Sequence, residues 1–324
     1  KICLCRRLLY YKMDINLMQI LFTLITVSVT LLGLVVKLAE PYLPIEIRNL
    51  FRYGRFAAEG KGSNIPTVSV PKRWFKHFYE FSAPASTCIL FIALRTYLGF
   101  GNLPKFFYQI LDLLLGENRK PLEHTTLALT LLTIQCWKRF YETHKVCIFS
   151  NSRMNLGHYL LGYLHYFGAI SCMIGESEEF FQGIIPLSPD LMQTVLQIPK
   201  LNWNRLTLTD YICAVIFLWT SYKQLTCNLI LANLRKNKKG DVVTLQHKVP
   251  RGDLFNYISS PLQSTEILLY LMLTIIMWSS RTYHYVFSWV LMNQMATGLF
   301  GHWWYVETFK DYPKQRKALI PYIL

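Results

Sequence analysis

The sequence lacks the short motifs that mark the common soluble enzyme classes. It has no G-x-G-x-x-G after a strand, no G-x-x-x-x-G-K-[ST], no H-E-x-x-H, no G-x-S-x-G and no zinc-deaminase signature. These absences argue against a Rossmann dehydrogenase, a P-loop NTPase, a zinc protease and an α/β-hydrolase. Gly60-Lys61-Gly62 is only a glycine-containing loop. A nucleotide that binds this chain must therefore be held by some other arrangement.

The cysteines form no recognisable framework. There are eight, at positions 3, 5, 88, 136, 147, 172, 213 and 227, and most lie inside apolar segments. No C-x-x-C pair is present, and no Cys/His spacing suits zinc. We therefore expect reduced, buried thiols and no metal site.

Charged residues are scarce, yet their balance is strongly basic. Only 16% of the 324 residues are charged and 52% are hydrophobic, while the formal net charge is +15. A soluble protein this basic would suggest a nucleic-acid partner. Here the basic residues lie between long apolar runs, so we discount nucleic acid and expect membrane lipid as the surrounding partner.

Seven apolar stretches approach the length of about 20 residues that a helix needs to cross a bilayer. They are Ile15–Val36, Ala83–Leu98, Leu122–Trp137, Met154–Ile174, Leu208–Ala232, Thr265–Ser279 and Tyr283–Phe300. The second and the sixth are short for a complete span. We predict an all-α integral membrane protein of about seven transmembrane helices forming a single bundle, without a Rossmann domain.

The loops between these stretches predict the orientation of the chain. Lys and Arg gather in the first, third and fifth loops and in the C-terminal tail, whereas the fourth loop is rich in Glu and Asp. By the positive-inside rule, the odd-numbered loops and the C-terminus are cytosolic. We interpret residues 1–12 as a basic leader, either native or an artefact of gene assembly, and residues 13–324 as a single seven-helix domain.

The most polar part of the chain follows the fifth apolar stretch. Arg235 and Lys236 begin a basic loop that continues through Lys238 and Lys239. Such a loop is often only a topology signal, but it can also hold the phosphates of a lipid or a nucleotide. Gln224, Asn228 and Arg235 share one helix face leading into it. Because polar groups at membrane depth usually face a cavity, we expect the entrance of a site here.

Three other helices carry polar stripes at helical spacing. The stripes are Gln135, Arg139 and Glu142 on the third, Asn155, His158, Gly162 and His165 on the fourth, and Asn293, Gln294, His302 and Tyr305 on the last. A single intramembrane histidine is more often structural than catalytic. Polar stripes on four of the seven expected helices instead indicate groups that meet inside the bundle.

Several motifs in the C-terminal third resemble the steroid 5α-reductase family. They are Pro250-Arg-Gly-Asp-Leu-Phe-Asn-Tyr-Ile-Ser-Ser-Pro261, Glu266, His302-Trp-Trp-Tyr305 and Tyr312-Pro-Lys-Gln-Arg-Lys-Ala-Leu-Ile-Pro-Tyr-Ile-Leu324. Two more, Val70-Pro-Lys-Arg-Trp-Phe-Lys-His-Phe-Tyr79 and Ile230-Leu-Ala-Asn-Leu-Arg-Lys-Asn-Lys238, are similar to the polyprenol reductase branch of that family. The resemblance implies a seven-helix reductase of the endoplasmic reticulum membrane that uses NADPH, with the cofactor-binding part at about 208–324.

The resemblance also implies site residues. Cofactor contacts are expected at Arg139, Gln224, Asn228, Arg235, Lys236, Tyr257, Glu266 and Asn293. Candidates for polarising or protonating the substrate are His302 and Tyr305 first, and His77 or Tyr79 second. The sequence departs from the family at Leu262-Gln263, where an asparagine is usual, and at Asp253, where the steroid enzymes have glycine. The Gln-Glu pair with which those enzymes grip the substrate carbonyl has no clear counterpart.

The implied reaction is reduction of the α-isoprene double bond of polyprenol or polyprenal in dolichol synthesis, which supports protein N-glycosylation. A long-chain polyisoprenoid is thus the expected substrate. Hydride needs an electrophilic β-carbon, which an α,β-unsaturated aldehyde offers and an allylic alcohol does not. A steroid 3-oxo-Δ4 5α-reductase and an enoyl-CoA reductase remain as enzyme alternatives. A seven-helix transporter or receptor leaves the basic loop and its polar stripe unexplained.

Overall fold

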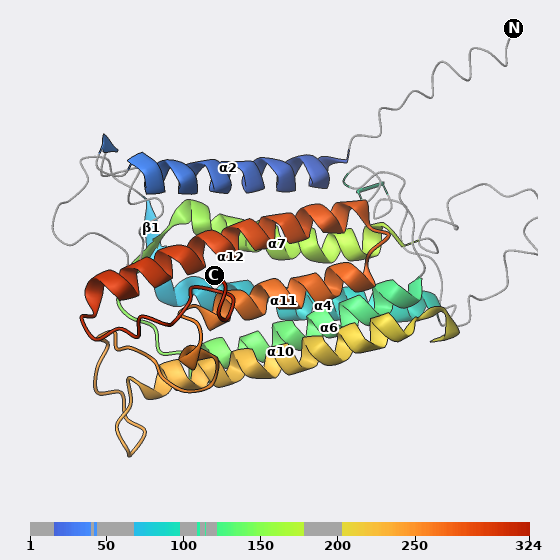
Figure 1. The fold of residues 1–324 in the computed structure, drawn as a ribbon. Coiled ribbons are helices and arrows are strands. Elements are labelled where there is room, and N and C mark those ends of the chain that lie inside the picture. The colour runs from blue at the N-terminus through green and yellow to red at the C-terminus, as the bar shows by residue number, and fades with distance from the viewer. Residues whose placement is uncertain are drawn as a thin grey trace, which may run out of the picture.

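A computed structural model of the chain describes residues 16–39, 42–43, 68–97, 109–110, 114, 122–177 and 203–324. Seven long helices make up most of this described part and run side by side (Figure 1). They are α2 (Leu17–Ala39), α4 (His77–Tyr97), α6 (Leu122–Tyr141), α7 (Leu156–Gly175), α10 (Leu208–Asn233), α11 (Pro261–Ile276) and α12 (Arg281–Thr308). The prediction of a seven-helix protein is confirmed. The leader 1–12 and most of the first and fourth loops lie outside the described residues.

The described residues contain no Rossmann sheet, as predicted. Their one sheet is a pair of short antiparallel strands, β1 (Ser69–Pro71) and β2 (Arg153–Asn155), which the sequence analysis did not anticipate. Strand β1 leads into α4 through a 3₁₀ turn, and β2 leads into α7. The pair therefore ties the starts of these two helices together at one end of the bundle.

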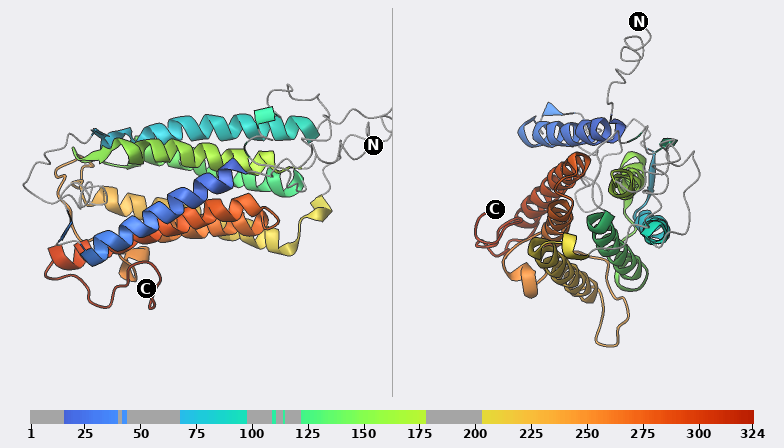
Figure 2. Two further views of the ribbon diagram at one scale, coloured as in Figure 1. Left: turned by 90° about the horizontal axis from the view of Figure 1, so that it is seen from above. Right: turned by 90° about the vertical axis from the view of Figure 1, so that its right-hand side faces the viewer.

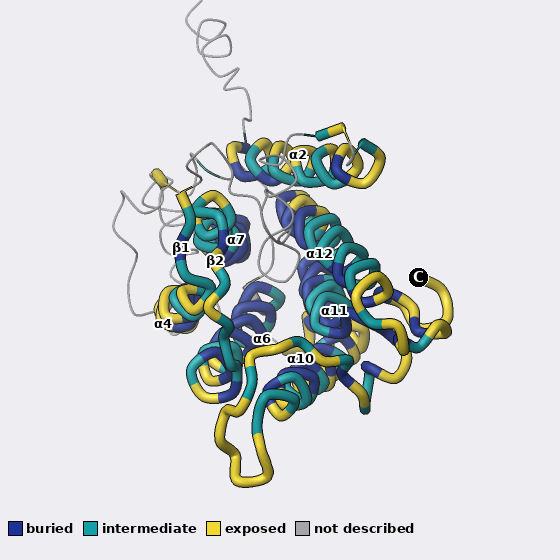
Figure 3. Tube along the Cα trace, turned by 90° about the vertical axis from the view of Figure 1, so that its left-hand side faces the viewer, coloured by how far each residue is buried: buried dark blue, intermediate teal, exposed yellow. Residues whose placement is uncertain are grey.

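The helices pack as a ring of neighbours. Helix α10 packs against α11, α11 against α12, and α4 against both α6 and α7, while α6 also contacts α10. Helix α2 lies outside this ring against α12 (Figures 2 and 3). Side chains from α4, α6, α7, α10, α11 and α12 line a cavity inside this ring of helices, which is the site described below.

Local sequence explains where several helices begin. Thr207 and Asp210 form a capping box at the start of α10, with the Asp210 carboxylate accepting from the Thr207 backbone N–H at 2.7 Å. Ser280 caps α12 by accepting from the Tyr283 N–H at 2.9 Å. Pro261 opens α11, a position where its missing N–H costs nothing. Each signal satisfies or removes a backbone donor that the helix leaves unpaired.

Helices α4 and α12 extend furthest beyond their predicted apolar stretches. Helix α4 starts at His77 rather than Ala83, and α12 runs to Thr308 rather than ending at Phe300. Hydropathy marks only the apolar part of a helix, so it misses polar turns that continue past it. These extensions carry Tyr79 and Tyr305, two of the predicted site residues.

One helix of the described residues, α2, is long and apolar enough to cross a membrane by length and composition, and the apolar α11 is shorter. The other expected spans have lower mean hydropathy because they carry polar side chains. Helix α6, for example, contains buried Glu123 and Gln135, and α10 contains buried Gln224 and Asn228. Polar residues that face the inside of a bundle lower the average of a helix without touching its outer face.

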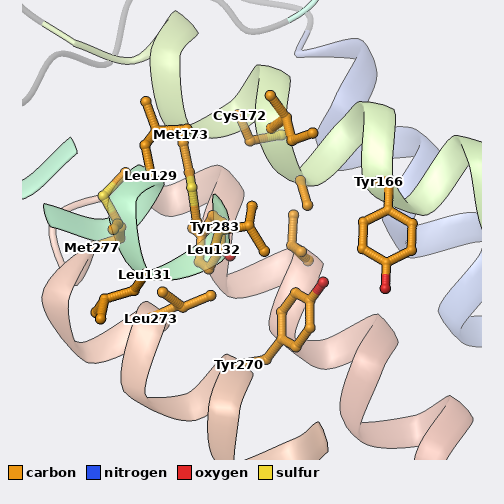
Figure 4. Close-up of a cluster of buried hydrophobic side chains, with 14 of the residues drawn as sticks. Leu129, Leu131, Leu132, Tyr166, Cys172, Met173, Tyr270, Leu273, Met277 and Tyr283 are labelled. Carbon is orange, nitrogen blue, oxygen red and sulfur yellow. The ribbon is translucent and has the colours of Figure 1, made fainter. Parts of the chain in front are cut away.

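A core of interlocking apolar side chains fills the bundle at the end where α7 finishes and α12 begins. Leu129 and Leu132 of α6 meet Met173 of α7 and Leu273 of α11 there, around the fully buried ring of Tyr283 (Figure 4). At the opposite end, the C-terminal segment runs beside the start of α11, and Ser259 N–H donates to the Lys317 carbonyl at 2.8 Å. One end of the bundle is thus closed by packing, and the other is built from loops.

Candidate active site

A cavity of about 510 Å³ lies between the helices, near the C-terminal end of α10 and the start of α11. This volume is in the range of small-molecule sites. Its polar lining residues include Arg139, Gln224, Asn228, Arg235, Lys248, Gln263, Glu266, Asn293 and Gln294. Its apolar lining residues include Phe75, Phe78, Phe149, Met154, Leu161, Tyr166, Trp289 and Val290. The cavity therefore offers both charged and apolar contacts to a ligand.

Gln224 lies at the centre of the hydrogen-bond network on the polar wall. Its carbonyl oxygen accepts from Gln135 Nε2 at 2.8 Å and from Lys138 Nζ at 2.6 Å, and its Nε2 donates to Glu266 at 2.7 Å. Ser221 completes the network by donating to Gln135 at 2.7 Å. The side-chain amides of Gln224 and Gln135 therefore both have hydrogen-bond partners for their oxygen and their nitrogen. This network holds the Glu266 carboxylate in position.

A buried ion cluster orients Arg139. Helix α6 continues into a π-helical turn, Glu142–Val146, and the fully buried Glu142 carboxylate there pairs with Arg139 and, at 3.2 Å, with Lys138. Arg139 Nε also donates to the Tyr79 hydroxyl at 3.1 Å. A π-turn is a frequent feature of functional sites. Here it brings one carboxylate back onto the two basic residues that precede it.

Asn228 lies on α10, and Arg235 lies just after the end of that helix, towards the loop end of the cavity. Asn228 Nδ2 is buried without a hydrogen-bond partner among the described residues. Arg235 donates to the carbonyl of Ile148, and partial burial lowers its pKa, although a guanidinium stays protonated at physiological pH. An orphaned buried donor beside a cation is what an anionic, acceptor-rich ligand would satisfy.

Helix α12 supplies the remaining wall. Asn293, Gln294 and Thr297 line the cavity from one face of this helix, and Tyr305 lines it from the next turns. The Tyr305 ring is buried and stacks on Tyr312 with centroids 5.4 Å apart and planes 14° apart. The C-terminal segment, which carries Tyr312, therefore holds Tyr305 in place.

Comparisons with known proteins agree with this architecture. Residues 194–324 match the family described as 3-oxo-5-alpha-steroid 4-dehydrogenase. The chain is 36% identical to a polyprenal reductase of Drosophila melanogaster over 97% of this chain and 95% of that one. The chain belongs to the polyprenal reductase branch of the steroid 5α-reductase family. Polyprenal reductases of Caenorhabditis elegans and Rattus norvegicus are 32% and 28% identical, over 91% and 93% of the chain and 94% of each relative.

Membership in the polyprenal reductases makes the chain an oxidoreductase and confirms the resemblance seen in the sequence. The matched segment 194–324 contains α10, α11, α12 and the C-terminal tail. Arg139 and Tyr79 lie before it, in the part that only the full-length relatives cover.

Eight of the twelve predicted site residues line the cavity. They are Tyr79, Arg139, Gln224, Asn228, Arg235, Glu266, Asn293 and Tyr305. They come from α4, α6, α10, α11 and α12, together with the loop that follows α10. The structure thus brings together residues that are far apart in the sequence, and the role of each remains a prediction.

The other four predicted residues lie away from the cavity wall. His77 bonds to the Tyr159 hydroxyl at 2.9 Å, and the ring of the half-exposed Tyr257 lies 6.0 Å from that of Tyr322. Lys236 pairs with Val242 in a short hairpin. His302 Nδ1 bonds to Ser259 Oγ at 2.7 Å, and Ser259 itself lines the cavity. His302 can therefore affect the cavity through Ser259, and through Tyr312, whose ring lies 6.3 Å from His302 and stacks on Tyr305.

The cavity also has lining residues that the site prediction left out. His158, Leu161, Gly162, His165 and Tyr166 form a continuous stripe on α7. The spacing of His158, Gly162 and His165 is visible in the sequence, but which side of the helix faces the cavity is not. Among the described residues, no group of three or more His, Cys, Asp or Glu side chains is placed to hold a metal ion.

Proposed function

We propose that this protein reduces the α-isoprene double bond of polyprenal with NADPH, in the synthesis of dolichol for protein N-glycosylation. The observation that carries the proposal is one cavity lined both by cationic and polar side chains and by aromatic ones. This cavity occurs in a chain that is 36% identical over nearly its whole length to a polyprenal reductase. A dinucleotide suits the cationic and polar residues, and the head of an isoprenoid suits the aromatic ones.

The aldehyde is the better direct substrate on chemical grounds. A carbonyl conjugated to the double bond accepts the negative charge that develops when hydride adds to the β-carbon. The double bond of an allylic alcohol has no such acceptor, so polyprenol must first be oxidised. The same argument applies to the enone of a steroid and to an enoyl thioester, which are therefore the alternative substrates of this architecture.

The residues present fit a phosphate-bearing nicotinamide cofactor. Arg139, Arg235 and Lys248 supply positive charge on one wall, and Asn228 supplies an unpartnered buried amide. Glu266, fixed by Gln224, offers an acceptor for the hydroxyl or amide groups of such a ligand. When bound, the reduced nicotinamide supplies the hydride. The chain's own task is to bind and orient both molecules and to exclude water.

Tyr79 is the proposed proton donor. Its hydroxyl oxygen accepts from Arg139, so its own proton is free to be donated to the substrate oxygen. As hydride adds to the β-carbon, the carbonyl oxygen takes the Tyr79 proton to give an enol, which returns to the saturated aldehyde. The Arg139 cation stabilises the phenolate until it regains a proton from solvent. Tyr305, the other lining tyrosine among the candidates, is second.

We further propose that the helices cross the membrane of the endoplasmic reticulum, with the C-terminus cytosolic. Helix α10 supports this with a stripe of exposed apolar side chains that includes Val215, 67% exposed, and Tyr222, 62% exposed. Exposed apolar surface of this extent fits lipid better than water. The basic residues Arg235, Lys236, Lys238 and Lys239 gather at the cavity end, which favours that end as cytosolic.

The test is a substrate panel with purified protein in detergent. Polyprenal, polyprenol, a steroid 3-oxo-Δ4 enone and an enoyl thioester are each incubated with NADPH, and the products are measured by mass spectrometry. We expect reduction of polyprenal and no reaction of polyprenol alone. Preference for the steroid or the thioester would assign one of the alternative activities, and no NADPH-dependent product would favour a transporter or receptor.

A variant pair tests the role of Tyr79. Removing a general acid costs about 100- to 10,000-fold in rate, so Tyr79→Phe should lower kcat by that factor. Tyr222→Phe is the matched control, because Tyr222 lies on the exposed outer face of α10. Equal activity of the two variants would remove Tyr79 from the mechanism.

A further inference from the structure

His165 is a cavity-lining group to which the proposed mechanism gives no task. It lies on α7 in the stripe formed by His158, Leu161, Gly162, His165 and Tyr166, opposite the wall built by α10. Its Nε2 is 2.6 Å from the hydroxyl of Tyr270 on α11. Its Nδ1 is buried without a hydrogen-bond partner among the described residues. A buried polar atom at a cavity wall that lacks a partner calls for an explanation.

Tyr270 decides which nitrogen of His165 carries the proton. Tyr270 is 2% exposed, and its hydroxyl has His165 as its hydrogen-bond partner in the described part of the chain. If the hydroxyl donates to Nε2, one group stays unpaired, the Nδ1–H. If Nε2–H donated instead, both the phenol hydrogen and the Nδ1 lone pair would be unpaired. Each unpaired buried group costs about 1–3 kcal/mol, so the first arrangement is favoured.

The unpaired Nδ1–H is therefore a buried hydrogen-bond donor on a residue that lines the cavity. The Tyr166 ring contacts both His165 and the proposed proton donor, with its centroid 4.9 Å from that of His165 and 5.5 Å from that of Tyr79. All three residues line the same cavity. The rings of Tyr166 and Tyr270 both project into the space between α7 and α11 (Figure 4). His165 and Tyr79 thus border the same region, on the aromatic side where the substrate head is proposed to lie.

We propose that His165 binds the carbonyl oxygen of the substrate through Nδ1–H, and that Tyr270 fixes the tautomer that makes this possible. The inference rests on the proposed function and assigns the oxygen subsite of that reaction. Together with the Tyr79 hydroxyl, the imidazole gives two donors to an oxygen that becomes more negative as hydride adds, and such donors strengthen towards the transition state. No proton leaves His165, so the imidazole is unchanged at the end of the turnover.

Kinetics of three variants test the assignment. Removing one donor to a developing oxyanion costs about 100-fold or more, so His165→Phe should lower kcat/KM for polyprenal by about that factor. His165→Gln keeps an N–H donor and should recover part of the loss. Tyr270→Phe keeps the imidazole but frees its tautomer, and should cost about 3- to 10-fold. His144→Gln is the matched control, since His144 lies on the π-turn, outside the cavity lining.

A binding measurement separates this role from a structural one. The thermal stability of wild type and variants is recorded with an isoprenoid aldehyde and with the hydrocarbon that lacks its oxygen. Wild type should be stabilised more by the aldehyde. His165→Phe should be stabilised equally by both, because the hydrocarbon contacts remain. The assignment would be overturned if His165→Phe kept both the preference for the aldehyde and a kcat/KM within about threefold of wild type.

The outcomes also separate this inference from the proposed function. If wild type does not reduce polyprenal with NADPH, the proposed function fails. If wild type reduces it and His165→Phe does so equally well, only the subsite assignment fails. Should His165→Phe not fold, His165→Gln and Tyr270→Phe decide. A weaker preference for the aldehyde in Tyr270→Phe supports the assignment. An unchanged preference in Tyr270→Phe contradicts the role of the tautomer.

Discussion

Gln224 on α10 donates a 2.7 Å hydrogen bond to the carboxylate of Glu266 on α11. The carbonyl of the same amide accepts from Gln135 and Lys138 on α6. A single buried side chain therefore joins three helices at the cavity wall. The position of Glu266, a proposed cofactor contact, depends on this amide.

Replacement of Gln224 by leucine should affect stability and cofactor binding together. Gln224→Leu leaves the donors of Gln135 and Lys138, and the Glu266 carboxylate, without their buried partner. Each such loss costs about 1–3 kcal/mol of unfolding free energy. We expect a lower thermal midpoint in detergent and a higher KM for NADPH. Gln315→Leu, an exposed amide in the C-terminal segment, should change neither; an unaltered Gln224→Leu would show that the network is not needed.

Two carboxylates on the same side of the bundle should differ sharply in their importance. Glu142 is fully buried between Lys138 and Arg139, so Glu142→Gln leaves buried cations uncompensated, at about 3–5 kcal/mol. Glu80 is half-exposed and pairs with His144 at 2.9 Å and Lys76 at 3.5 Å, so Glu80→Gln should cost under about 1 kcal/mol. Denaturant unfolding of the two variants compares these values directly. Similar losses would contradict the ion cluster as the anchor of Arg139.

Alanine at two glycine positions should destabilise the protein for two different reasons. A Cβ on Gly162 of α7 would lie 2.6 Å from the Phe78 ring of α4, which is buried, so Gly162→Ala overpacks the helix contact by about 1–3 kcal/mol. Gly240 has open space around it but a φ of +91°, so Gly240→Ala costs about 1–2 kcal/mol of backbone strain. Only the first lines the cavity. Gly162→Ala should therefore also raise the KM for polyprenal, whereas Gly240→Ala should leave it unchanged.

The sequence predicts the helices well because long apolar runs mark them directly. All seven predicted spans overlap a helix of the structure. The ends are less accurate where a helix continues into polar sequence, as α4 does at His77 and α12 does at Thr308. The three-residue strands β1 and β2 are too short to show a period in the sequence.

The site is predictable where helical spacing fixes a face and unpredictable where loops intervene. Gln224 and Asn228 share a face of α10, and both line the cavity. Lys236 and Tyr257 lie in the segment between α10 and α11, whose path sets the side-chain direction independently of helical spacing. His165 belongs to a polar stripe in the sequence, but its partner Tyr270 is 105 residues away, so their pairing emerges only from the fold.

Cys147 offers a direct probe of cofactor occupancy. It lies on the cavity wall, just after the π-turn, and burial raises the pKa of its thiol. The thiolate is the reactive form, so a small uncharged maleimide should label Cys147 slowly at neutral pH. Labelling should speed up as the pH rises, and it should need a higher pH than labelling of an unperturbed thiol. NADPH should protect Cys147 from labelling but not Cys88, which is exposed on α4. Cys147→Ser identifies the labelled site by mass spectrometry; labelling unaffected by NADPH would place the cofactor elsewhere.

Transfer of hydride from NADPH to an isoprenoid enal is the central claim, and isotope labelling tests it most directly. Purified protein is incubated with polyprenal and NADPH deuterated at the hydride-donating carbon, and the product is analysed by mass spectrometry. The account predicts a saturated aldehyde that carries one deuterium at its β-carbon. Recovery of unchanged polyprenal, or of a saturated aldehyde without deuterium, would contradict it.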